Sequence, residues 1–294
     1  MALTLSGGGQ GGVFTLRGRS FGGSFTTSTA PVVPLLLDTY PDAAAAYSLR
    51  KLRTAYTGSA IRVRRSSDNT ETDIGFVNDV LDTTTLLTFC GSGNGFVTTW
   101  YDQSGNTNNA VQATAGLQAR IVNAGAITYQ NGKPVIDFYG AGIFYTYNPV
   151  LATGDWSLYL VQKRPSAATQ GILLANTAGG LFFCQNSDNN FYIQRVTGTT
   201  GFYKFAADST ATFCVLSGYN ISNVTSAYKN NIQYSLSADI SFGATSITSY
   251  NSIGNYNGLA QSAGYVCEII IYANNQTSNK TGIDSNINSY YSIY

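Results

Sequence analysis

The sequence contains no histidine and only two glutamates, Glu71 and Glu268, in 294 residues. Without an imidazole the chain cannot form a Ser-His-Asp or Cys-His catalytic unit, use histidine as a general base, or bind zinc through histidine. Charged side chains are also scarce, at 11% of the residues, where about 25% is usual. Any catalysis by this chain must therefore use carboxylates.

Cysteine is rare and scattered, and the lack of a C-x-x-C pair argues against a zinc ribbon or a thioredoxin-like site. Three of the four cysteines lie in apolar, strand-like runs, where buried free thiols are expected: Cys184, Cys214 and Cys267. No apolar run approaches the roughly 18 residues of a membrane span. The N-terminus also lacks the basic and apolar regions of a signal peptide. We therefore expect no membrane partner.

Residues 1–36 differ in composition from the rest of the chain. Short apolar triplets alternate with Gly-rich breaks such as SGGGQGG, and the segment has too little apolar surface to fold alone. Holding it in place costs about 1–2 kcal/mol per residue, which contacts with a neighbouring subunit can offset. We interpret residues 1–36 as an N-terminal assembly arm and residues 37–294 as one domain. The alternative is an arm that folds back on its own domain.

Helical spacing appears at three places. After Pro41 one stripe carries Ala45, Leu49, Leu52 and Tyr56, which predicts an α-helix. A second short helix is predicted between Asn78 and Cys90. A third is predicted near the C-terminus, where one stripe carries Ile283, Ile287, Tyr290 and Tyr294.

The segment AIRVRRSSDNTETDIGF predicts a β-hairpin whose turn is residues 66–69. This register places Arg64 opposite Glu71 and Arg62 opposite Asp73, with Ile61, Val63 and Ile74 on the other face. Because a nearby arginine lowers the pKa of a carboxyl group, Glu71 and Asp73 are poor candidates for a general acid.

Short strands account for most of the remaining chain. They are separated by Gly, Asn, Ser and Asp turns and do not alternate with helices, so we predict an all-β, antiparallel sandwich with a few short helices. The candidate strands are residues 96–101, 134–138, 157–163, 171–175, 181–184, 191–196, 212–219, 226–229 and 265–272.

Glu268 lies in the apolar run GYVCEIIIY, where Val266, Ile270 and Tyr272 would share its strand face. Desolvation there would raise its pKa, as a general acid requires. The alternative is a structural glutamate that is paired with arginine or with the backbone. A glycosidase would also need a second carboxylate about 5–9 Å away, and the sequence marks none.

The stretch TTWYDQSGNTNN offers Asp102, Asn106 and Asn108 as candidate calcium ligands, but it lacks the glycine and the closing glutamate of a calcium loop. A turn rich in Asx hydrogen bonds is the alternative. Two tryptophans, Trp100 and Trp156, are candidate sugar-stacking platforms, although aromatic residues also fill sandwich cores. No segment interleaves basic and aromatic residues as RNA-binding motifs do, so we expect no direct nucleic-acid partner.

Four segments resemble, in order and spacing, the catalytic domain of the alpha-L-arabinofuranosidase B family: AAYSLRKLRTAYTGSAIRVRRSSDNTETDIGF, Cys90, WYDQSGNTNNAVQAT and NGKPVIDF. The resemblance implies a concanavalin A-like (LamG-like) jelly-roll sandwich. Modules of this kind are also similar to domains of bacteriophage virion proteins that end in a motif like NINSYYSIY.

The resemblance also implies where catalytic residues should be. The family's nucleophilic glutamate follows a vicinal Cys-Cys pair, whereas the counterpart here, LFFCQNSDNN, has only Cys184 and offers Asp188 as a substitute. The family's acid is an aspartate, and Asn255, followed by Tyr256, stands at its place. An amide cannot donate a proton as a carboxylic acid does. On this basis we expect no catalytic residue, and no enzyme.

These inferences together predict a non-catalytic virion structural protein, located in the virion as a capsid decoration, head fibre or tail component. It would contact other virion proteins, form a homo-oligomer and touch host surface glycans. The candidate glycan-binding residues are Trp100, Trp156, Asp188, Asn255 and Tyr256, and calcium is the single candidate cofactor. The alternatives are an arabinofuranosidase-like glycoside hydrolase and a carbohydrate-binding lectin module.

Overall fold

The computed structural model describes residues 34–138, 140, 142–151, 154–164, 171–176, 180–185, 190–194, 202–205, 212–222, 224–240, 249–254 and 264–294. These residues form antiparallel β-structure with a few short helices, which confirms the predicted all-β sandwich. The α-helices among them are α1 (Leu36–Thr39), α2 (Thr83–Cys90) and α3 (Lys280–Tyr291). None of these helices has the length and apolar character needed to span a bilayer.

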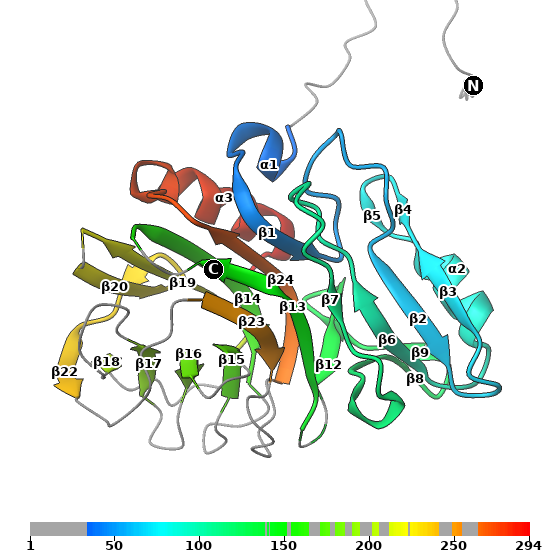
Figure 1. The fold of residues 1–294 in the computed structure, drawn as a ribbon. Helices are drawn as coiled ribbons and strands as arrows, with labels where there is room; N and C mark the ends of the chain where they lie inside the picture. The colour runs from blue at the N-terminus through cyan, green and yellow to red at the C-terminus, as the bar shows by residue number, and fades with distance from the viewer. Residues whose placement is uncertain are drawn as a thin grey trace, which may run out of the picture. The chain divides into compact units, whose positions relative to one another are not determined.

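One layer of the sandwich is centred on β24, which pairs with β14 along one edge and with β1 and β12 along the other. β14 then pairs with β19, and β19 with β20. Figure 1 shows α1 and α3 over the outer face of this layer. Its strands are β1 (Ala43–Ser48), β12 (Ile136–Phe138), β14 (Trp156–Lys163), β19 (Cys214–Ile221), β20 (Val224–Lys229) and β24 (Gly264–Tyr272).

The hydrogen-bonded network continues from β12 through β8 to β6, which pairs with β2 and β7. From β7 it runs through β13, β23, β15, β16, β17 and β18 to β22. These strands are β2 (Ile61–Arg65), β3 (Glu71–Ile74), β6 (Gly95–Trp100), β7 (Ala110–Val111), β8 (Arg120–Asn123), β9 (Ala126–Ile127), β13 (Phe144–Leu151), β15 (Gly171–Asn176), β16 (Gly180–Gln185), β17 (Phe191–Gln194), β18 (Phe202–Phe205), β22 (Leu236–Ile240) and β23 (Ser249–Gly254).

Short hairpin strands complete the described structure. They are β4 (Phe76–Val77) with β5 (Val80–Leu81), β10 (Tyr129–Gln130) with β11 (Lys133–Pro134), and β21 (Ile232–Gln233) beside β20. The nine candidate strands of the sequence analysis all coincide with observed strands, with ends that differ by a few residues. The short helix expected between Asn78 and Cys90 is confirmed as α2, whose N-cap Asp82 accepts a hydrogen bond from the Thr85 amide.

Two hydrophobic clusters hold the sandwich together. The larger one lies inside the sandwich and combines side chains from both parts of the β-network, such as Ile61, Trp100, Leu160 and Ile269. The second lies on the outer face of the β24 layer, where Tyr159 and Tyr272 contact the α3 residue Ile287. The β24 layer is therefore buried on both faces, which explains its long apolar run IIIY.

The hairpin register is confirmed: Ile61 pairs with Ile74, Arg62 with Asp73, and Arg64 with Glu71. Its apolar face is fully buried, as the alternation required. A local pattern sufficed here because a short loop fixes which residues face each other.

The helix predicted after Pro41 is wrong, because residues 43–48 form strand β1. β1 pairs with β24 from Ala43 opposite Tyr272 to Ser48 opposite Glu268. Alanine favours helix when it is judged alone, but here Ala45 and Ala46 face opposite hydrophobic clusters and both are fully buried. Burial on both faces of a sheet outweighed the intrinsic preference of the alanines.

The C-terminal helix is confirmed with a shifted stripe. α3 ends at Tyr291, and Ser292 beyond it adopts a left-handed conformation with φ 52°. Ile283, Ile287 and Tyr291 are buried, whereas Tyr294 is 51% exposed. The helix therefore stops one turn earlier than the pattern indicated.

The predicted arm, residues 1–36, lies mostly outside the described residues, which begin at Pro34. Leu36 belongs to α1 and is buried in the outer hydrophobic cluster. The arm and the domain boundary at residue 37 stay predictions, as does the homo-oligomer.

Gly254 at the end of β23 provides a test of this packing. Its φ is +98°, and a Cβ atom built there would lie 2.6 Å from the carbonyl oxygen of Ile143. We expect Gly254→Ala to lower the free energy of unfolding by about 2–4 kcal/mol, since backbone strain and overpacking add. Gly116→Ala is the control in denaturant unfolding, because nothing lies within 4 Å of that Cβ position. Equal stability of the two variants would contradict the described end of β23.

Candidate functional site

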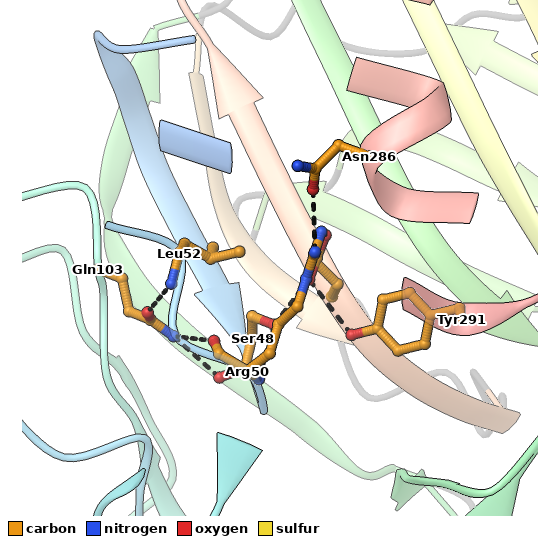
Figure 2. Close-up of polar contacts among 7 residues, drawn as sticks. Ser48, Arg50, Leu52, Gln103, Asn286 and Tyr291 are labelled. Atoms are coloured by element: carbon orange, nitrogen blue, oxygen red, sulfur yellow. Dashed lines mark hydrogen bonds and ion pairs between the residues drawn. The ribbon is translucent and has the colours of Figure 1, made fainter. Parts of the chain in front are cut away.

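Glu268 lies on β24, its residue is only 1% exposed, and its carboxylate is fully engaged. The Arg50 guanidinium donates from Nε to Oε2 at 2.8 Å and from Nη2 to Oε1 at 2.9 Å. The hydroxyl groups of Ser48 and Tyr291 donate to Oε2 at 2.7 Å and 3.2 Å (Figure 2). This is a buried bidentate ion pair with two further donors.

A β-bulge determines on which face of β24 the side chain of Glu268 lies. In the pairing of β14 with β24, Val161 lies opposite Glu268 but Gln162 lies opposite Val266, so Cys267 is an extra residue. Val266 therefore belongs to the inner cluster, whereas Ile270 and Tyr272 belong to the outer cluster near α3. The expectation that Val266 shares the face of Glu268 is wrong, and the bulge is the reason.

The partner Arg50 is itself held from several sides. Its Nη1 donates to Oδ1 of Asn286 on α3 at 2.9 Å, and its guanidinium lies 4.8 Å from the centre of the Tyr290 ring. Burial opposes the charge of Arg50, but the adjacent Glu268 carboxylate outweighs this effect and raises the pKa of Arg50.

Gln103 fixes the backbone that carries Arg50. Its Nε2 donates to the carbonyl oxygens of Ser48 and Arg50, each at 3.0 Å, and its Oε1 accepts from the Leu52 amide at 2.8 Å (Figure 2). The cluster of Ser48, Arg50, Gln103, Glu268 and Tyr291, here called the Arg50 cluster, joins β1, β24, α3 and the loop after β6.

The Arg50 cluster supports the structural interpretation of Glu268. Both oxygens of this carboxylate already accept hydrogen bonds from protein donors, two of them from one arginine. It is also closed to substrate by burial. Glu268 therefore links β24 to the end of β1 and to α3 rather than acting as a general acid.

The exposed face of the hairpin carries a second group of charges. Arg62 contacts both Glu71, at 2.8 Å, and Asp73, at 3.3 Å, and the Tyr101 hydroxyl donates to Asp73 at 2.7 Å. Arg64 instead donates to Gln118 at 2.8 Å. The predicted pairing of each arginine with its own carboxylate is thus replaced by one arginine that bridges two carboxylates. All three are more than a third exposed, so these ion pairs add little stability.

The calcium candidates hold a hydrogen-bonded turn. The Asp102 carboxylate accepts from the amides of Ala46, Ser104 and Asn108 and from the Ser104 hydroxyl, at 2.7–3.0 Å. Asn106 and Asn108 donate their side-chain amides to carbonyl groups at the start of β1. The described residues contain no cluster of three His, Cys, Asp or Glu side chains that suits a metal ion. A calcium site at Asp102 stays a prediction.

The two tryptophans lie in the inner cluster of the sandwich. Trp100 is 0% exposed and Trp156 is 3% exposed, so neither ring is an exposed stacking platform. The other three candidate glycan-binding residues, Asp188, Asn255 and Tyr256, lie outside the described residues. The glycan site of these five candidates therefore stays a prediction.

The cysteines whose side chains the structure describes are buried, as the sequence predicted for Cys214 and Cys267. Cys90, Cys214 and Cys267 are buried, and they form no disulfide in the part of the chain that the structure describes. The side chain of Cys184 lies outside the described residues.

The sequence pattern did not identify Arg50 and Ser48 as partners of Glu268, or Gln103 as the residue that holds the backbone of Arg50. A glutamate buried in an apolar strand needs a cationic partner, so the run around Glu268 did indicate that one exists. The pattern did not identify which arginine provides it, because Arg50 and Glu268 are 218 positions apart.

Part of the sequence is similar to a known protein family. Residues 38–136 match the model of the alpha-L-arabinofuranosidase B catalytic family. The probable alpha-L-arabinofuranosidase B of Aspergillus flavus is 40% identical over 78 residues, which are 26% of this chain and 15% of that protein. The enzyme of Penicillium canescens is 38% identical over 78 residues, 26% of this chain and 17% of that protein. The chain thus spans less than a fifth of these relatives.

The similarity in fold to solved structures covers more of the chain than the similarity in sequence. An arabinofuranosidase complexed with arabinofuranosyl-alpha-1,2-xylobiose superposes with a TM-score of 0.61 at 16% identity, covering 86% of this chain and 64% of that one. A GH54 α-L-arabinofuranosidase soaked with a cyclic sulfate inhibitor gives a TM-score of 0.60 at 17% identity, with the same coverage. The described sandwich therefore has the fold of these enzymes.

These comparisons correct the functional expectations. The interpretation as a virion structural protein, with its capsid keywords and its location in the virion, is wrong, because the matched relatives are arabinofuranosidases of Aspergillus and Penicillium. The expectation of no enzyme is wrong for a similar reason, since residues 38–136 match the model of an arabinofuranosidase catalytic family. The resemblance was right in its fold and wrong in the link to virion proteins.

Proposed function

We propose that this chain is a glycoside hydrolase module that acts on α-L-arabinofuranosides. The match of residues 38–136 to the arabinofuranosidase B catalytic model carries the proposal. The fold likeness over 86% of the chain supports it. Because the matched segment is only 15% of that relative, the activity of the whole protein is part of the proposal.

Such a reaction needs two carboxyl groups, one as acid and one as nucleophile or base. Among the described side chains Glu268 is closed by Arg50, Asp102 is saturated by donors, and Asp137 is paired with Arg120 at 2.9 Å. Asp188 and Asp208 lie outside the described residues. We propose Asp188 as one catalytic carboxylate, because it lies where the sequence resemblance places the family's nucleophile.

The test is release of 4-nitrophenol from 4-nitrophenyl α-L-arabinofuranoside. We expect turnover by the unmodified chain and a loss of at least about 100-fold in kcat for Asp188→Asn, the size of an acid–base or nucleophilic contribution. Asp68→Asn is the control, because Asp68 is an exposed hairpin residue paired with Arg65.

Two results would count against this proposal. No release of nitrophenol at high protein concentration would contradict the proposed hydrolase activity. Saturable sugar binding without turnover would instead support a lectin-type module. Normal activity of Asp188→Asn would remove Asp188 from the site but leave the hydrolase in place.

A further inference from the structure

A polar pocket of about 400 Å³ lies between the loop after β1 and the β4–β5 hairpin. Its walls include Lys51, Tyr56, Ser59, Phe76, Asn78 and Asp79, and we call it the Tyr56 pocket. Its volume is within the range of about 300–1,000 Å³ found for small-molecule sites. No residue of the Arg50 cluster lines it.

Two aromatic rings form one wall of the Tyr56 pocket. The rings of Tyr56 and Phe76 meet edge to face, with centroids 6.3 Å apart and planes at 77°. Both residues are partly exposed, and Phe76 also packs against the inner cluster. The Tyr56 hydroxyl donates to the Ser59 carbonyl oxygen at 2.7 Å, which fixes the ring.

Gly58 leaves room for this arrangement. A Cβ atom at residue 58 would lie 2.6 Å from the Tyr56 hydroxyl oxygen. The opposite wall is also fixed in shape, because Asn78 and Asp79 form the two-residue turn of the β4–β5 hairpin with φ values of 50° and 62°. The pocket is therefore formed before any ligand binds.

Charged and polar groups of the pocket are left without side-chain partners. Within the part of the chain that the structure describes, the ammonium of Lys51 and the carboxylate of Asp79 make no ion pair or side-chain hydrogen bond. The pocket thus offers a free donor, a free acceptor and the Asn78 amide, which is both.

The combination selects a neutral polyhydroxyl ligand. Lys51 and Asp79 carry opposite charges, so together they favour neither an anion nor a cation, whereas hydroxyl groups can accept from Lys51 and donate to Asp79. Aromatic rings accept the apolar face of a sugar ring while polar groups orient it. The geometry points to the Tyr56 pocket as a saccharide-binding subsite that holds part of a neutral pentose oligosaccharide. Only the choice of pentose rests on the proposed function.

Xylotriose is the probe, because it carries no arabinofuranosyl group and is not consumed by the proposed reaction. Binding is followed by NMR titration of the full chain, with chemical-shift changes expected at residues 51–59 and 75–79. We expect Phe76→Ala to weaken binding at least about tenfold and Lys51→Gln or Asp79→Asn to weaken it about threefold to tenfold. Tyr129→Ala is the matched control, because Tyr129 is an exposed ring, at 46%, outside the pocket.

The affinity of the Tyr129→Ala control for xylotriose should be within twofold of that of the unmodified chain. Equal binding by Phe76→Ala and the control, or no saturable shift at these residues, would overturn the subsite. If Phe76→Ala fails to fold, the two polar variants decide the question, since both residues are at the surface. Hydrolysis of the nitrophenyl arabinofuranoside by the unmodified chain is a separate readout. Binding that depends on the pocket without hydrolysis would therefore remove the proposed function and leave the subsite.

Discussion

Replacing Arg50 with methionine should lower the free energy of unfolding by about 3–5 kcal/mol, the cost of leaving one charge of a buried pair without its partner. Methionine keeps much of the length of the arginine side chain but removes both bonds to Glu268. The carboxylate would keep only the Ser48 and Tyr291 hydroxyl groups, in a place where it is 1% exposed. The three elements that meet there, β1, β24 and α3, would all lose a shared contact.

The measurement is denaturant unfolding at neutral pH, and Arg62→Met is the matched control. Arg62 also contacts two carboxylates, but its side chain is 40% exposed, so we expect its loss to cost no more than about 1 kcal/mol. The double variant Arg50→Met with Glu268→Leu should recover most of the loss, because no charge then remains buried. A single variant as stable as the control would show that Glu268 does not depend on Arg50.

The parts of the fold that the sequence predicted are those set by neighbouring residues. The hairpin register follows from alternation across a short loop, and α2 is capped by its own neighbour Asp82, which accepts from the Thr85 amide. β1 was missed because its alanines carry no strand preference of their own, and its pairing with β24 joins residues more than 200 positions apart. The direction of Glu268 was missed because a bulge at Cys267 breaks the alternation on which the prediction relied.

The functional error has a related cause. The segment WYDQSGNTNN, which carried much of the resemblance, has a structural role: Trp100 is in the core, Asp102 accepts from the Ala46 amide in β1, and Gln103 holds the backbone of Arg50. Such residues preserve a fold whatever its chemistry. The candidate catalytic position, Asp188, is in the half of the chain where the resemblance is loosest. The first half of the sequence thus indicates the fold, but it does not identify the catalytic carboxylates.

Trp100→Ala should show whether this tryptophan belongs to the core or to a sugar site, and we expect a loss of about 3–5 kcal/mol in the free energy of unfolding. The indole is 0% exposed, its ring centroid lies 5.8 Å from that of Tyr47, and Tyr47 in turn packs on Tyr147 at 5.8 Å. Removing the indole therefore opens a cavity in a chain of aromatic contacts between β1, β6 and β13.

Trp100→Phe is the conservative comparison for this test. It keeps a ring in the cavity and removes an indole N–H that is buried without a hydrogen bond among the described residues, so its cost should be clearly smaller. Thermal and denaturant unfolding give the stabilities, and titration with xylotriose gives sugar binding for the folded variants. A Trp100→Ala protein of unchanged stability but weakened sugar binding would return Trp100 to the sugar site. The expected result, large instability with near-normal binding by Trp100→Phe, assigns sugar recognition to surface groups such as those of the Tyr56 pocket.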